Sequence, residues 1–537
     1  MVADPEFSNK NNGGGGGWLK DVRKAVYQTS TDGSTYYVAR LFSNESSILA
    51  DFNLEADKLY AFSAWVQVKQ GQSFIKAVFE TPTNNYTAGA VIAKQGCWSM
   101  LKGGVVVNVS EPAHLRFQSG GDNLTAEVWI DSVSLQPFTR EEWQSHRAAA
   151  VEKSRKRRVK FVAEDAGGMP LPNATVSVNQ SRPDFPFGCA INQFILENPA
   201  YADWYLRRGF RYTVFENELK WTTTEPAQGA VNYTLPDALL NFSKSHGLTP
   251  RGHCVMWGSN KANPDWVNSI TAGDAPRLQE AGDARIQSAM NRYKGEFFQW
   301  DIVNENMHNV FLEEVMGPDA STRYYKKANE IDPATVPFLN EYNTIERPFD
   351  MEATPWQYLQ KVQTIRAQGY KGPLGIGLQA HFAALNLPFV RASIDVLRSA
   401  KLPIWITELD VSSTQGPNQA PYFEELLREL HAHEAVEGIM IWGGWWPKGG
   451  CYKMCLTDDN FNNLPAGDVV DKIMAEWTYG RDGVQGTTDA SGSFKTSLFY
   501  GEYEAIVSHP KLGKLPTVQK FRVVPEGQRQ RNVAFKI

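Results

Sequence analysis

The sequence of 537 residues lacks two features that would narrow the class of protein at once. It contains no run of about 18 apolar residues, the length that a membrane-spanning helix needs. It also lacks an excess of positive charge, because 54 Lys and Arg residues stand against 59 Asp and Glu residues, for a net charge of -5. Proteins that grip nucleic acid through its phosphates present a basic surface. We therefore expect neither a membrane-spanning segment nor a nucleic-acid partner.

Cysteine is scarce as well. Five cysteines are too few for a disulfide scaffold in a chain of this length. Cys451 and Cys455 flank Tyr-Lys-Met after two glycines, a spacing that would allow a small loop disulfide in an oxidising compartment. The same pair is a weak zinc site, since no second pair of ligands stands nearby. We expect no metal and no cofactor.

The first 17 residues lack the apolar core of a secretory signal: they read MVADPEFSNKNNGGGGG, which predicts a flexible leader. Asn-x-Ser/Thr sequons are nevertheless frequent along the chain. They begin at Asn44, Asn85, Asn108, Asn123, Asn173, Asn179, Asn232 and Asn241. Such clustering favours a secreted protein, extracellular or in a cell wall, whose signal peptide is absent from this sequence.

Aromatic residues are abundant, at 12% of the chain with 16 Trp. Most aromatic rings in proteins fill cores, but an excess is also what sugar-binding surfaces need, because the C–H faces of sugar rings stack on them. A chain of this length is too long for one core, and the pattern of apolar and polar residues changes along the sequence. We expect several domains.

Residues 18–140 predict an all-β sandwich that follows the leader. Apolar and polar residues alternate between Gly, Asn and Pro turns in the runs YYVARLF, LYAFSAWVQVKQ, SFIKAVFET, GVVVNVS, HLRFQ and LTAEVWIDSVSLQ. Residues 141–158 begin with residues that favour a helix and end in the basic run RKRR. Such a run is more typical of a solvated linker than of an anion-binding site, although anchoring to an acidic polysaccharide stays open.

Residues 185–479 predict a TIM barrel with the (β/α)8 fold, so the fold class is α/β with flanking all-β domains. Short apolar runs alternate here with helical stretches such as YFEELLRELHAHEA. The eight runs are FPFGCAIN, YTVFENE, TPRGHCVMW, FFQWDIVNE, VPFLNEYN, LGIGLQAHF, PIWITELDV and GIMIWGGWW.

Two β-rich segments flank the predicted barrel, at residues 159–184 and 480–537. The turn-strand rhythm of GVQGTTDASGSFKTSLFYGEYEAIV and of VKFVAEDAGGMPLPNATVSV suits two halves of one small β-sandwich. A domain inserted into a loop is tolerated where the chain ends lie close together. One split sandwich is therefore expected; the alternative is that the two segments form separate edges of the barrel.

Polar side chains stand where the predicted barrel strands end. The stretch QWDIVNENMH delivers Asn304 and Glu305, and WITELDV delivers Glu408 and Asp410. The remaining strand-end residues are Glu216, Asn217, Glu218, Lys220, His253, Trp257, Glu341, Tyr342, Asn343, Gln379, His381 and Trp442. In a barrel they converge at the carboxyl-terminal face. Two carboxylates among amides, His and Trp suit glycoside hydrolysis, with one carboxyl protonated and the other ionised.

Five ordered motifs carry a resemblance to a known family. RGHCVMW, WDIVNE, GIGLQAHF and WITELDV resemble glycoside hydrolase family 10, the endo-β-1,4-xylanases, and ENELKWTTTEP is similar to that family's strand-two signature. The resemblance implies a retaining mechanism with Glu305 as general acid/base and Glu408 as nucleophile. It also implies that Asn304 bonds the sugar 2-OH and that His381, backed by Asp410, bonds Glu408 beside Gln379. The substrate-binding residues implied in addition are Glu216, Asn217, Lys220, His253, Trp257, Tyr342, Trp442 and Trp446.

The N-terminal module resembles carbohydrate-binding module family 22 in WIDSVSLQPF and LYAFSAWVQV. Together with GCYKMCLTDDNFNNLPAGDVVDK, this combination resembles the plant branch of the family. One departure stands out, because the bacterial and fungal pattern WHSQ is here WGSN, with Gly258 in place of His. Hydrogen bonding on the glycone side is therefore expected to differ.

Two other functions remain open. A retaining enzyme can pass its glycosyl intermediate to a second sugar chain, which makes a transglycosylase; Trp445, Trp446 and Tyr452 are candidates to hold that acceptor. The chain could instead be a catalytically silent wall-binding protein, but intact Glu305 and Glu408 argue against that. The expected partner is xylan or arabinoxylan, and we expect a monomer.

Overall fold

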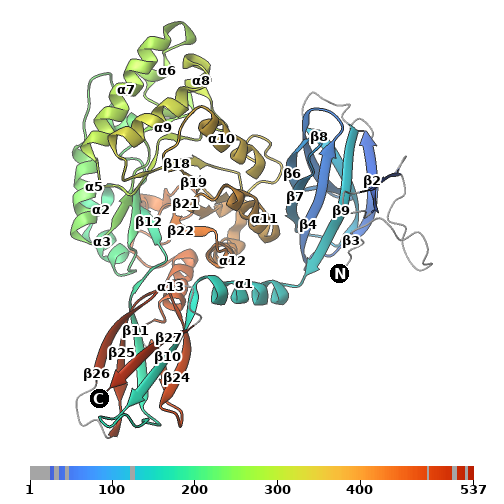
Figure 1. Cartoon of the computed structure of the whole chain (residues 1–537). Helices are drawn as coiled ribbons and strands as arrows, with labels where there is room; N and C mark the ends of the chain where they lie inside the picture. The colour runs from blue at the N-terminus through green and yellow to red at the C-terminus, as the bar shows by residue number, and fades with distance from the viewer. Residues whose placement is uncertain are drawn as a thin grey trace.

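The computed structural model describes residues 25–29, 35–42, 48–120, 127–480, 483–510, 517–525 and 530–536. The leader predicted for residues 1–17 lies outside these ranges. A barrel surrounded by helices forms the largest part of the molecule, with one β-sandwich beside it and a second below it (Figure 1). The predicted fold class, a TIM barrel flanked by all-β domains, is confirmed.

The barrel is a ring of eight parallel strand positions. Its strands are short and almost entirely buried, which explains their continuous apolar runs. In chain order they are β12 (Phe187–Ile191), β13 (Tyr212–Phe215), β14 (Thr249–Arg251), β16 (Gln299–Asp301), β18 (Val336–Glu341), β19 (Gly375–Leu378), β21 (Ile404–Val411) and β22 (Val436–Ile441), with the extensions β15 (Met256–Trp257), β17 (Val303–Asn304) and β20 (His381–Phe382).

The ring closes between β14 and β16. Gly252 donates its N–H to Gln299 O at 2.8 Å, and Asp301 donates its N–H to Gly252 O at 3.0 Å. A side chain at this position would collide with the Trp300 indole, since a Cβ on Gly252 would lie 2.3 Å from a ring carbon. Glycine is thus required where strand three meets strand four, and the closed ring brings the carboxyl ends of all eight strands to one face.

Amphipathic helices cover the barrel. In α7, for example, Leu278, Ile286 and Ala289 recur at helical spacing on the buried face. The α-helices are α2 (Phe194–Glu197), α3 (Pro199–Leu206), α4 (Trp221–Thr224), α5 (Thr234–Ser245), α6 (Asp265–Asn268), α7 (Ala275–Arg292), α8 (Phe311–Met316), α9 (Ala320–Ile331), α10 (Pro355–Ala367), α11 (Leu387–Leu397), α12 (Gln419–Ala432) and α13 (Pro465–Trp477). Short 3-10 turns lie at η1 (Asn260–Ala262), η2 (Ala272–Asp274), η3 (Arg398–Ala400), η4 (Ser413–Asn418) and η5 (Pro447–Gly449).

The N-terminal module consists of two antiparallel sheets packed face to face, in the orders β1-β2-β9-β4-β7 and β3-β8-β5-β6. Phe62, Phe79 and Phe117 fill the space between them. The strands are β1 (Ala25–Thr29), β2 (Thr35–Phe42), β3 (Ile48–Leu54), β4 (Leu59–Val68), β5 (Gln72–Glu80), β6 (Asn85–Lys94), β7 (Ser99–Val105), β8 (Glu111–Gly120) and β9 (Glu127–Phe138).

The N-terminal module packs directly on the barrel through β7 and helix α11. Asn386, which caps α11, donates its side-chain amide to Gly104 O at 3.0 Å. Lys102 forms an ion pair with Asp395 at 3.5 Å farther along the helix. A Cβ on Gly104 would lie 2.3 Å from the Pro388 side chain, so glycine permits this close approach.

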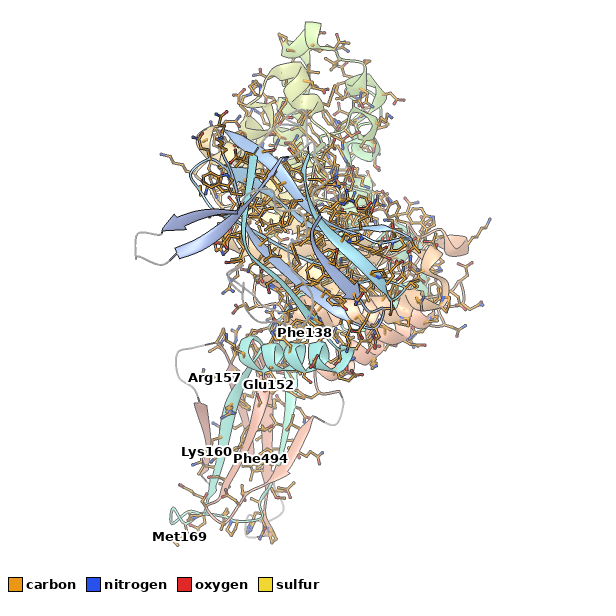
Figure 2. All side chains as sticks on the ribbon, turned by 90° about the vertical axis from the view of Figure 1, so that its right-hand side faces the viewer. Phe138, Glu152, Arg157, Lys160, Met169 and Phe494 are labelled. Atoms are coloured by element: carbon orange, nitrogen blue, oxygen red, sulfur yellow. A yellow bond between two sulfur atoms is a disulfide. The ribbon has the colours of Figure 1, made fainter. Side chains whose placement is uncertain are left out.

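The second sandwich combines strands from before and after the barrel. β10 (Lys156–Glu164) pairs antiparallel with β24 (Ser493–Phe499) and parallel with β27 (Gln530–Lys536). β11 (Thr175–Pro183) pairs with β23 (Val484–Thr487) and β25 (Gly501–Ser508), which in turn pairs with β26 (Thr517–Val523). Phe161, Val176 and Tyr503 lie in one core between the two sheets. Figure 2 labels Lys160 on β10 and Phe494 on the neighbouring strand β24, with Met169 at the far tip of this sandwich.

The basic run RKRR is not a solvated linker, and that interpretation is wrong. Helix α1 (Arg140–Ser154) is followed directly by β10, with Glu152 and Arg157 close together at the junction in Figure 2. Arg155 donates to the backbone carbonyls of His431, His433 and Val436, and Arg157 donates to Val524 O at 2.9 Å. The two arginines tie α1 to backbone carbonyl groups of the barrel, and β10 to the carbonyl group of Val524.

Within the described ranges, no helix combines the length and the apolar character needed to traverse a lipid bilayer.

Candidate active site

Glu408 lies at the end of β21, with only 4% of its surface exposed, and is surrounded by groups that favour its charged form. Asn340 donates its amide to Glu408 Oε1 at 2.7 Å. His381 Nε2 lies 3.4 Å from Oε2, and His253 Nδ1 lies 3.9 Å from Oε1. Burial by itself raises the pKa of Glu408, but His253, His381 and Asn340 outweigh it and lower that pKa to about 2.

His381 connects Glu408 to a second buried carboxylate. Its Nδ1 forms an ion pair with Asp410 Oδ1 at 2.9 Å, on the side of the ring opposite Glu408. Burial disfavours a charged imidazole, yet the two carboxylates outweigh it and raise the pKa of His381 to about 10. The backbone N–H of His381 donates to Glu346 at 3.0 Å, which holds β20 in place. His381 is therefore an imidazolium beside Glu408 at neutral pH.

Asn340 joins the strands that carry the two carboxylates. It also donates to Asn304 Oδ1 at 2.9 Å, and it accepts from Thr407 Oγ1 at 2.6 Å. Asn340 was not among the predicted site residues. The signal was available, because it precedes Glu341 in VPFLNEYN and an amide is unusual in a buried strand.

Glu305 has a different environment from Glu408. Trp257 donates its indole N–H to Glu305 Oε2 at 2.9 Å, and Gln379 donates to Oε1 at 3.1 Å. Both donors are neutral, and the side chain is only half-buried. Glu305 has a positive φ of 56°, and its N–H donates to Asn340 O at 2.9 Å. The two carboxylates thus lie in one cluster but in opposite electrostatic settings.

The glycone candidates on strands two, three and eight also gather here. Lys220 Nζ donates to Asn217 Oδ1 at 2.8 Å and lies 5.0 Å from the Trp257 ring centre and 5.8 Å from that of Trp442. Burial, followed by the nearby Glu218, raises the pKa of Glu216 to about 8. Glu216 is therefore largely uncharged at neutral pH.

Within the part of the chain that the structure describes, three buried polar atoms of the candidate sugar-binding residues have no hydrogen-bond partner: Asn304 Nδ2, His253 Nε2 and Glu216 Oε1. His381 Nδ1 and the Asp410 carboxylate also lack hydrogen-bond geometry, but they face each other as an ion pair. The other side-chain atoms of Asn304 and His253 are occupied, because Asn340 donates to Asn304 Oδ1 and His253 Nδ1 donates to Asp301 at 2.7 Å. A buried polar atom without a partner is costly unless a ligand or water satisfies it. These atoms mark where a polar ligand would be bound.

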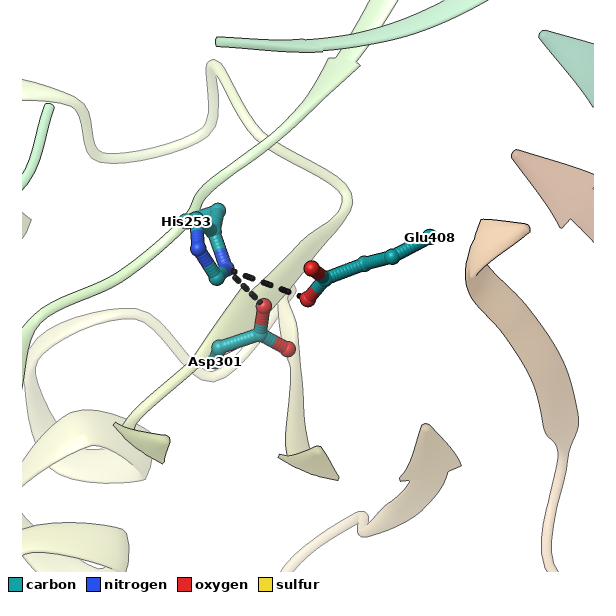
Figure 3. A group of neighbouring side chains, drawn as sticks. All are labelled: His253, Asp301 and Glu408. Carbon is teal, nitrogen blue, oxygen red and sulfur yellow. Dashed lines mark hydrogen bonds and ion pairs between the residues drawn. The ribbon is translucent and has the colours of Figure 1, made fainter. Parts of the chain in front are cut away.

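His253, Asp301 and Glu408 lie close enough to offer ligand atoms to a cation, as Figure 3 shows. Asp301 is already neutralised, because it accepts from His253 on one oxygen and from the fully buried Arg251 on the other. A cation would have to displace the His253 N–H and would be repelled by the Arg251 guanidinium. The geometry suits an electrostatic support for Glu408 better than a metal centre.

A clamp that the sequence analysis missed lies next to Glu305. His308 Nδ1 donates to Glu341 Oε1 at 2.8 Å, and His308 Nε2 donates to Asp350 at 3.1 Å. The His308 ring is stacked on Tyr342, with 3.9 Å between ring centres and an angle of 10° between ring planes. His308 ends the motif QWDIVNENMH, but its partner Asp350 lies in a loop whose path the sequence does not indicate.

The loop after β22 carries the other aromatic candidates. A disulfide joins Cys451 to Cys455, whose Cα atoms are 5.5 Å apart. The intervening Tyr452 is 66% exposed and has its ring 5.1 Å from that of His381, edge to face. Tyr452 therefore lies at the rim of the site beside the support of Glu408.

Trp445 and Trp446 differ from Tyr452. Trp445 belongs to the barrel core, with its indole N–H donating to Asp459 at 3.1 Å, so its interpretation as an acceptor platform is wrong. Trp446 is half-buried and lies against Phe194, with ring centres 5.3 Å apart. Among the described residues, Trp446 makes its ring contact with Phe194 and not with Glu305 or Glu408.

Gly258, the departure from the family pattern, has a structural reason. A Cβ at this position would lie 2.4 Å from Asn309 O and 2.9 Å from Glu305 O. The N–H of Gly258 donates to Asn304 O at 2.7 Å, and its carbonyl accepts from Phe311 N at 3.0 Å. The loop that follows Glu305 thus packs against the backbone of residue 258 and leaves no room for a side chain.

Comparisons with known proteins identify the family of the chain. Residues 178–472 match the sequence model of Glycosyl hydrolase family 10. The chain is 38% identical over 489 residues to Endo-1,4-beta-xylanase 5 of Arabidopsis thaliana, covering 89% of this chain and 84% of that protein. It is 33% identical over 533 residues to Endo-1,4-beta-xylanase 4 of the same plant, covering 95% and 92%. Anti-sigma-I factor RsgI6 of Acetivibrio thermocellus is 33% identical over 383 residues, covering 70% of this chain and 48% of that protein.

Proposed function

Because the chain belongs to glycosyl hydrolase family 10 and is a glycoside hydrolase, we propose that it cleaves internal β-1,4-xylosidic bonds of xylan or arabinoxylan with retention of configuration. The observation that carries this proposal is the electrostatic contrast between its two carboxylates. Glu408 is flanked by imidazoles that keep it ionised, whereas Glu305 is held only by neutral donors. Retaining glycosidases need one carboxylate that stays ionised as the nucleophile and a second carboxyl group that carries the proton for the leaving oxygen.

In the first step, the ionised Glu408 attacks the anomeric carbon and the glycosidic C–O bond breaks. Glu305 gives its proton to the departing oxygen, so that the leaving chain departs as a neutral alcohol. The imidazolium of His381 orients Glu408 and remains protonated throughout, because its pKa of about 10 lies far above neutral pH. A covalent glycosyl–Glu408 ester is left behind.

In the second step, Glu305 acts as a base. It removes a proton from a water molecule, whose oxygen attacks the anomeric carbon and releases Glu408 as a carboxylate. Two inversions give net retention, so the first-formed product is the β-anomer. Proton NMR in the first minutes of reaction distinguishes the anomers, and an initial α-anomer would overturn this mechanism.

The three unpartnered atoms are proposed to bind the sugars on the glycone side. Asn304 Nδ2 can donate to a sugar 2-OH, because its Oδ1 already accepts from Asn340. His253 Nε2 and Glu216 Oε1 are the other two groups, and Trp442 and Lys220 are the adjoining aromatic and cationic surfaces. An uncharged Glu216 can both donate and accept, as a hydroxyl-rich ligand requires.

Transfer to a second xylan chain is the alternative reaction of the same site. Tyr342 and the exposed Tyr452 are aromatic surfaces that could hold an acceptor in place of water. Labelled xylo-oligosaccharide added to a xylan digest would separate the two outcomes. Label in products longer than the added sugar indicates transfer.

Secretion is proposed from the sequons. Every sequon asparagine that the structure describes is exposed, as glycosylation requires: Asn85, Asn108, Asn173, Asn179, Asn232 and Asn241. The disulfide between Cys451 and Cys455 fits an oxidising compartment. Treating secreted material with a glycosidase that removes N-glycans should lower its apparent mass.

We also interpret the N-terminal sandwich as a sugar-binding module, and the second sandwich as one domain interrupted by the barrel.

The direct test of function compares polysaccharides. The protein is incubated with purified xylan, mannan and cellulose, and the products are resolved by size. Glu408→Ala is the matched control; it should fold normally, lose turnover and regain cleavage of an activated aryl xyloside when azide replaces the carboxylate. Products from mannan or cellulose but not from xylan would refute the proposed substrate, and products from none of the three would favour a silent wall-binding protein.

A further inference from the structure

The clamp of His308, Glu341 and Asp350 joins two loops on one side of the carboxylate cluster. Glu341 is the last residue of β18 and is fully buried. Its Oε1 accepts from His308 and from the N–H of Tyr342, and its Oε2 accepts from the N–H of Met307 at 2.8 Å. The loop that follows Glu305 is therefore tied to the end of the neighbouring strand.

Asp350 extends the clamp into the loop after β18. Its Oδ2 accepts from His308 at 3.1 Å and from Asn343 at 2.7 Å, and its Oδ1 accepts from the N–H of Glu352 at 3.1 Å. Both ring nitrogens of His308 thus face carboxylate oxygens. Each nitrogen can make such a contact only as an N–H donor, so the ring is an imidazolium.

The charges within the clamp support that assignment. Burial alone lowers the pKa of His308, but Asp350 and Glu341 outweigh it and raise that pKa to about 10. The same contacts, with the help of Asn343, hold the pKa of Asp350 at about 2 against the effect of burial. His308 and Asp350 are thus charged throughout the neutral range, whereas burial raises the pKa of Glu341.

The stacked Tyr342 lies on the leaving-group side of the site. The glycone candidates come from strands two, three and eight, whereas Tyr342 follows β18, the neighbour of the strand that carries Glu305. Tyr342 is tied to the loop that follows Glu305, because its ring stacks on His308 with 3.9 Å between ring centres and because Met307 donates to Glu341, the residue before Tyr342. Glu305, the proposed proton donor, has to lie next to the oxygen of the cleaved bond. The sugar that leaves with this oxygen is therefore expected on the same side of the site as Tyr342.

We propose that His308 is a positioning residue for the sugar beyond the cleaved bond: clamped between Glu341 and Asp350, it holds Tyr342 flat as the stacking surface for the leaving chain and for any acceptor chain. This role rests on the proposed function and names the part of the polysaccharide that the clamp serves. It also explains why residue 258 lacks a side chain, since the loop that carries His308 packs against it.

The test separates substrates that use this surface from one that does not. Xylohexaose fills the leaving-group side with sugar, whereas β-xylobiosyl fluoride releases only fluoride and leaves that side empty. His308→Gln and Asp350→Asn should lower kcat/KM for xylohexaose by roughly ten- to a hundredfold, the scale expected when a reacting group is misplaced. The loss on xylobiosyl fluoride should stay below about threefold, since no sugar rests on Tyr342.

A second measurement tests whether His308 acts through Tyr342. With xylobiosyl fluoride as donor, the xylobiose concentration needed for half-maximal transfer should rise in His308→Gln. The double variant with Tyr342→Ala should lose no more than Tyr342→Ala alone, because the two residues form one surface. His246→Gln is the matched control and should behave as wild type. It replaces an exposed histidine at the carboxyl-terminal cap of α5.

The outcomes distinguish a failure of the positioning role from a failure of the proposed function. Equal losses on both substrates, or an unchanged acceptor dependence in a folded variant, would refute the positioning role while wild-type cleavage of xylan upholds the function. A wild-type protein that cleaves neither substrate would refute the proposed function and this role with it. Asp350→Asn keeps the shape of the side chain, so it serves if His308→Gln fails to fold.

Discussion

Replacing Asp410 with Asn should make the protein less tolerant of alkali, because Asp410 sustains the charge on His381. The carboxylate lies 2.9 Å from the imidazole, whose pKa is raised to about 10. In the variant that pKa falls, so His381 loses its proton, and Glu408 loses the donor that orients it, at a lower pH than in the wild type. His253 and Asn340 remain, so the loss is partial.

The size of the effect follows from the shift in the pKa of His381. Moving that pKa from 6.5 to about 10 corresponds to roughly 5 kcal/mol of differential interaction, net of the opposing burial. If Asp410 supplies about a third to a half of it, the alkaline limb of kcat/KM moves down by about one to two pH units, or ~1.4–2.7 kcal/mol. The sign is fixed: loss of a nearby anion lowers the pKa of an imidazole.

The assay measures kcat/KM for β-xylobiosyl fluoride between pH 5 and 10.5, with unfolding followed in parallel. Stability should respond in the same direction, since a raised histidine pKa contributes stability that is lost as pH rises through the folded-state value. Asp489→Asn, an exposed turn residue of the second sandwich, is the control. An alkaline limb that stays in place, or that moves to higher pH, would refute the assignment of His381 as a charged support.

Three further changes give distinct outcomes. Glu305→Ala should lower cleavage of xylan by roughly 100-fold, the usual scale for a general acid, with a smaller loss on xylobiosyl fluoride; equal losses would contradict the acid role. Gly258→Ala places a Cβ 2.4 Å from Asn309 O, so its melting temperature should fall by the equivalent of about 1–3 kcal/mol and xylan cleavage should fall with it, whereas unchanged melting and activity would show that the loop yields freely. Truncation after Tyr479 removes every partner strand of β10 and β11, so the product should aggregate or be digested rapidly by protease; a soluble product with the wild-type melting curve would show that the barrel does not need the sandwich.

The catalytic candidates are accessible from sequence because a buried strand has a simple signature. FFQWDIVNE and PIWITELDV are apolar on both faces, so the carboxylate that ends each run is conspicuous, and one closed ring brings all such ends together. The same reasoning does not identify Asn340 as a site residue, because it lies inside a strand. Its hydrogen-bond partners Asn304 and Glu408 come from other barrel strands, which the local sequence does not indicate.

Loops are less predictable than strands for a physical reason. Asp350 reaches His308 only because the chain between them folds back, and no local pattern in the sequence encodes that return. The N-terminal sandwich shows the same limit: GVVVNVS predicts a strand, but β7 ends at Val105, while β3 and β6 have no counterpart among the predicted runs. Arg155 and Arg157 look like solvent-exposed charge in sequence, and only the carbonyl groups of the barrel and the sandwich reveal their role.

The placement of β10 in its sheet has a consequence for biosynthesis. β10 is the middle strand, and both of its partners, β24 and β27, are encoded after the barrel. A nascent chain must therefore carry Phe161 and the open edges of β10 unpaired while the ribosome completes the entire barrel. Such edges invite association between chains until they are covered. The sandwich closes only when synthesis has passed the barrel, so its closure distinguishes complete chains from products that stop inside it.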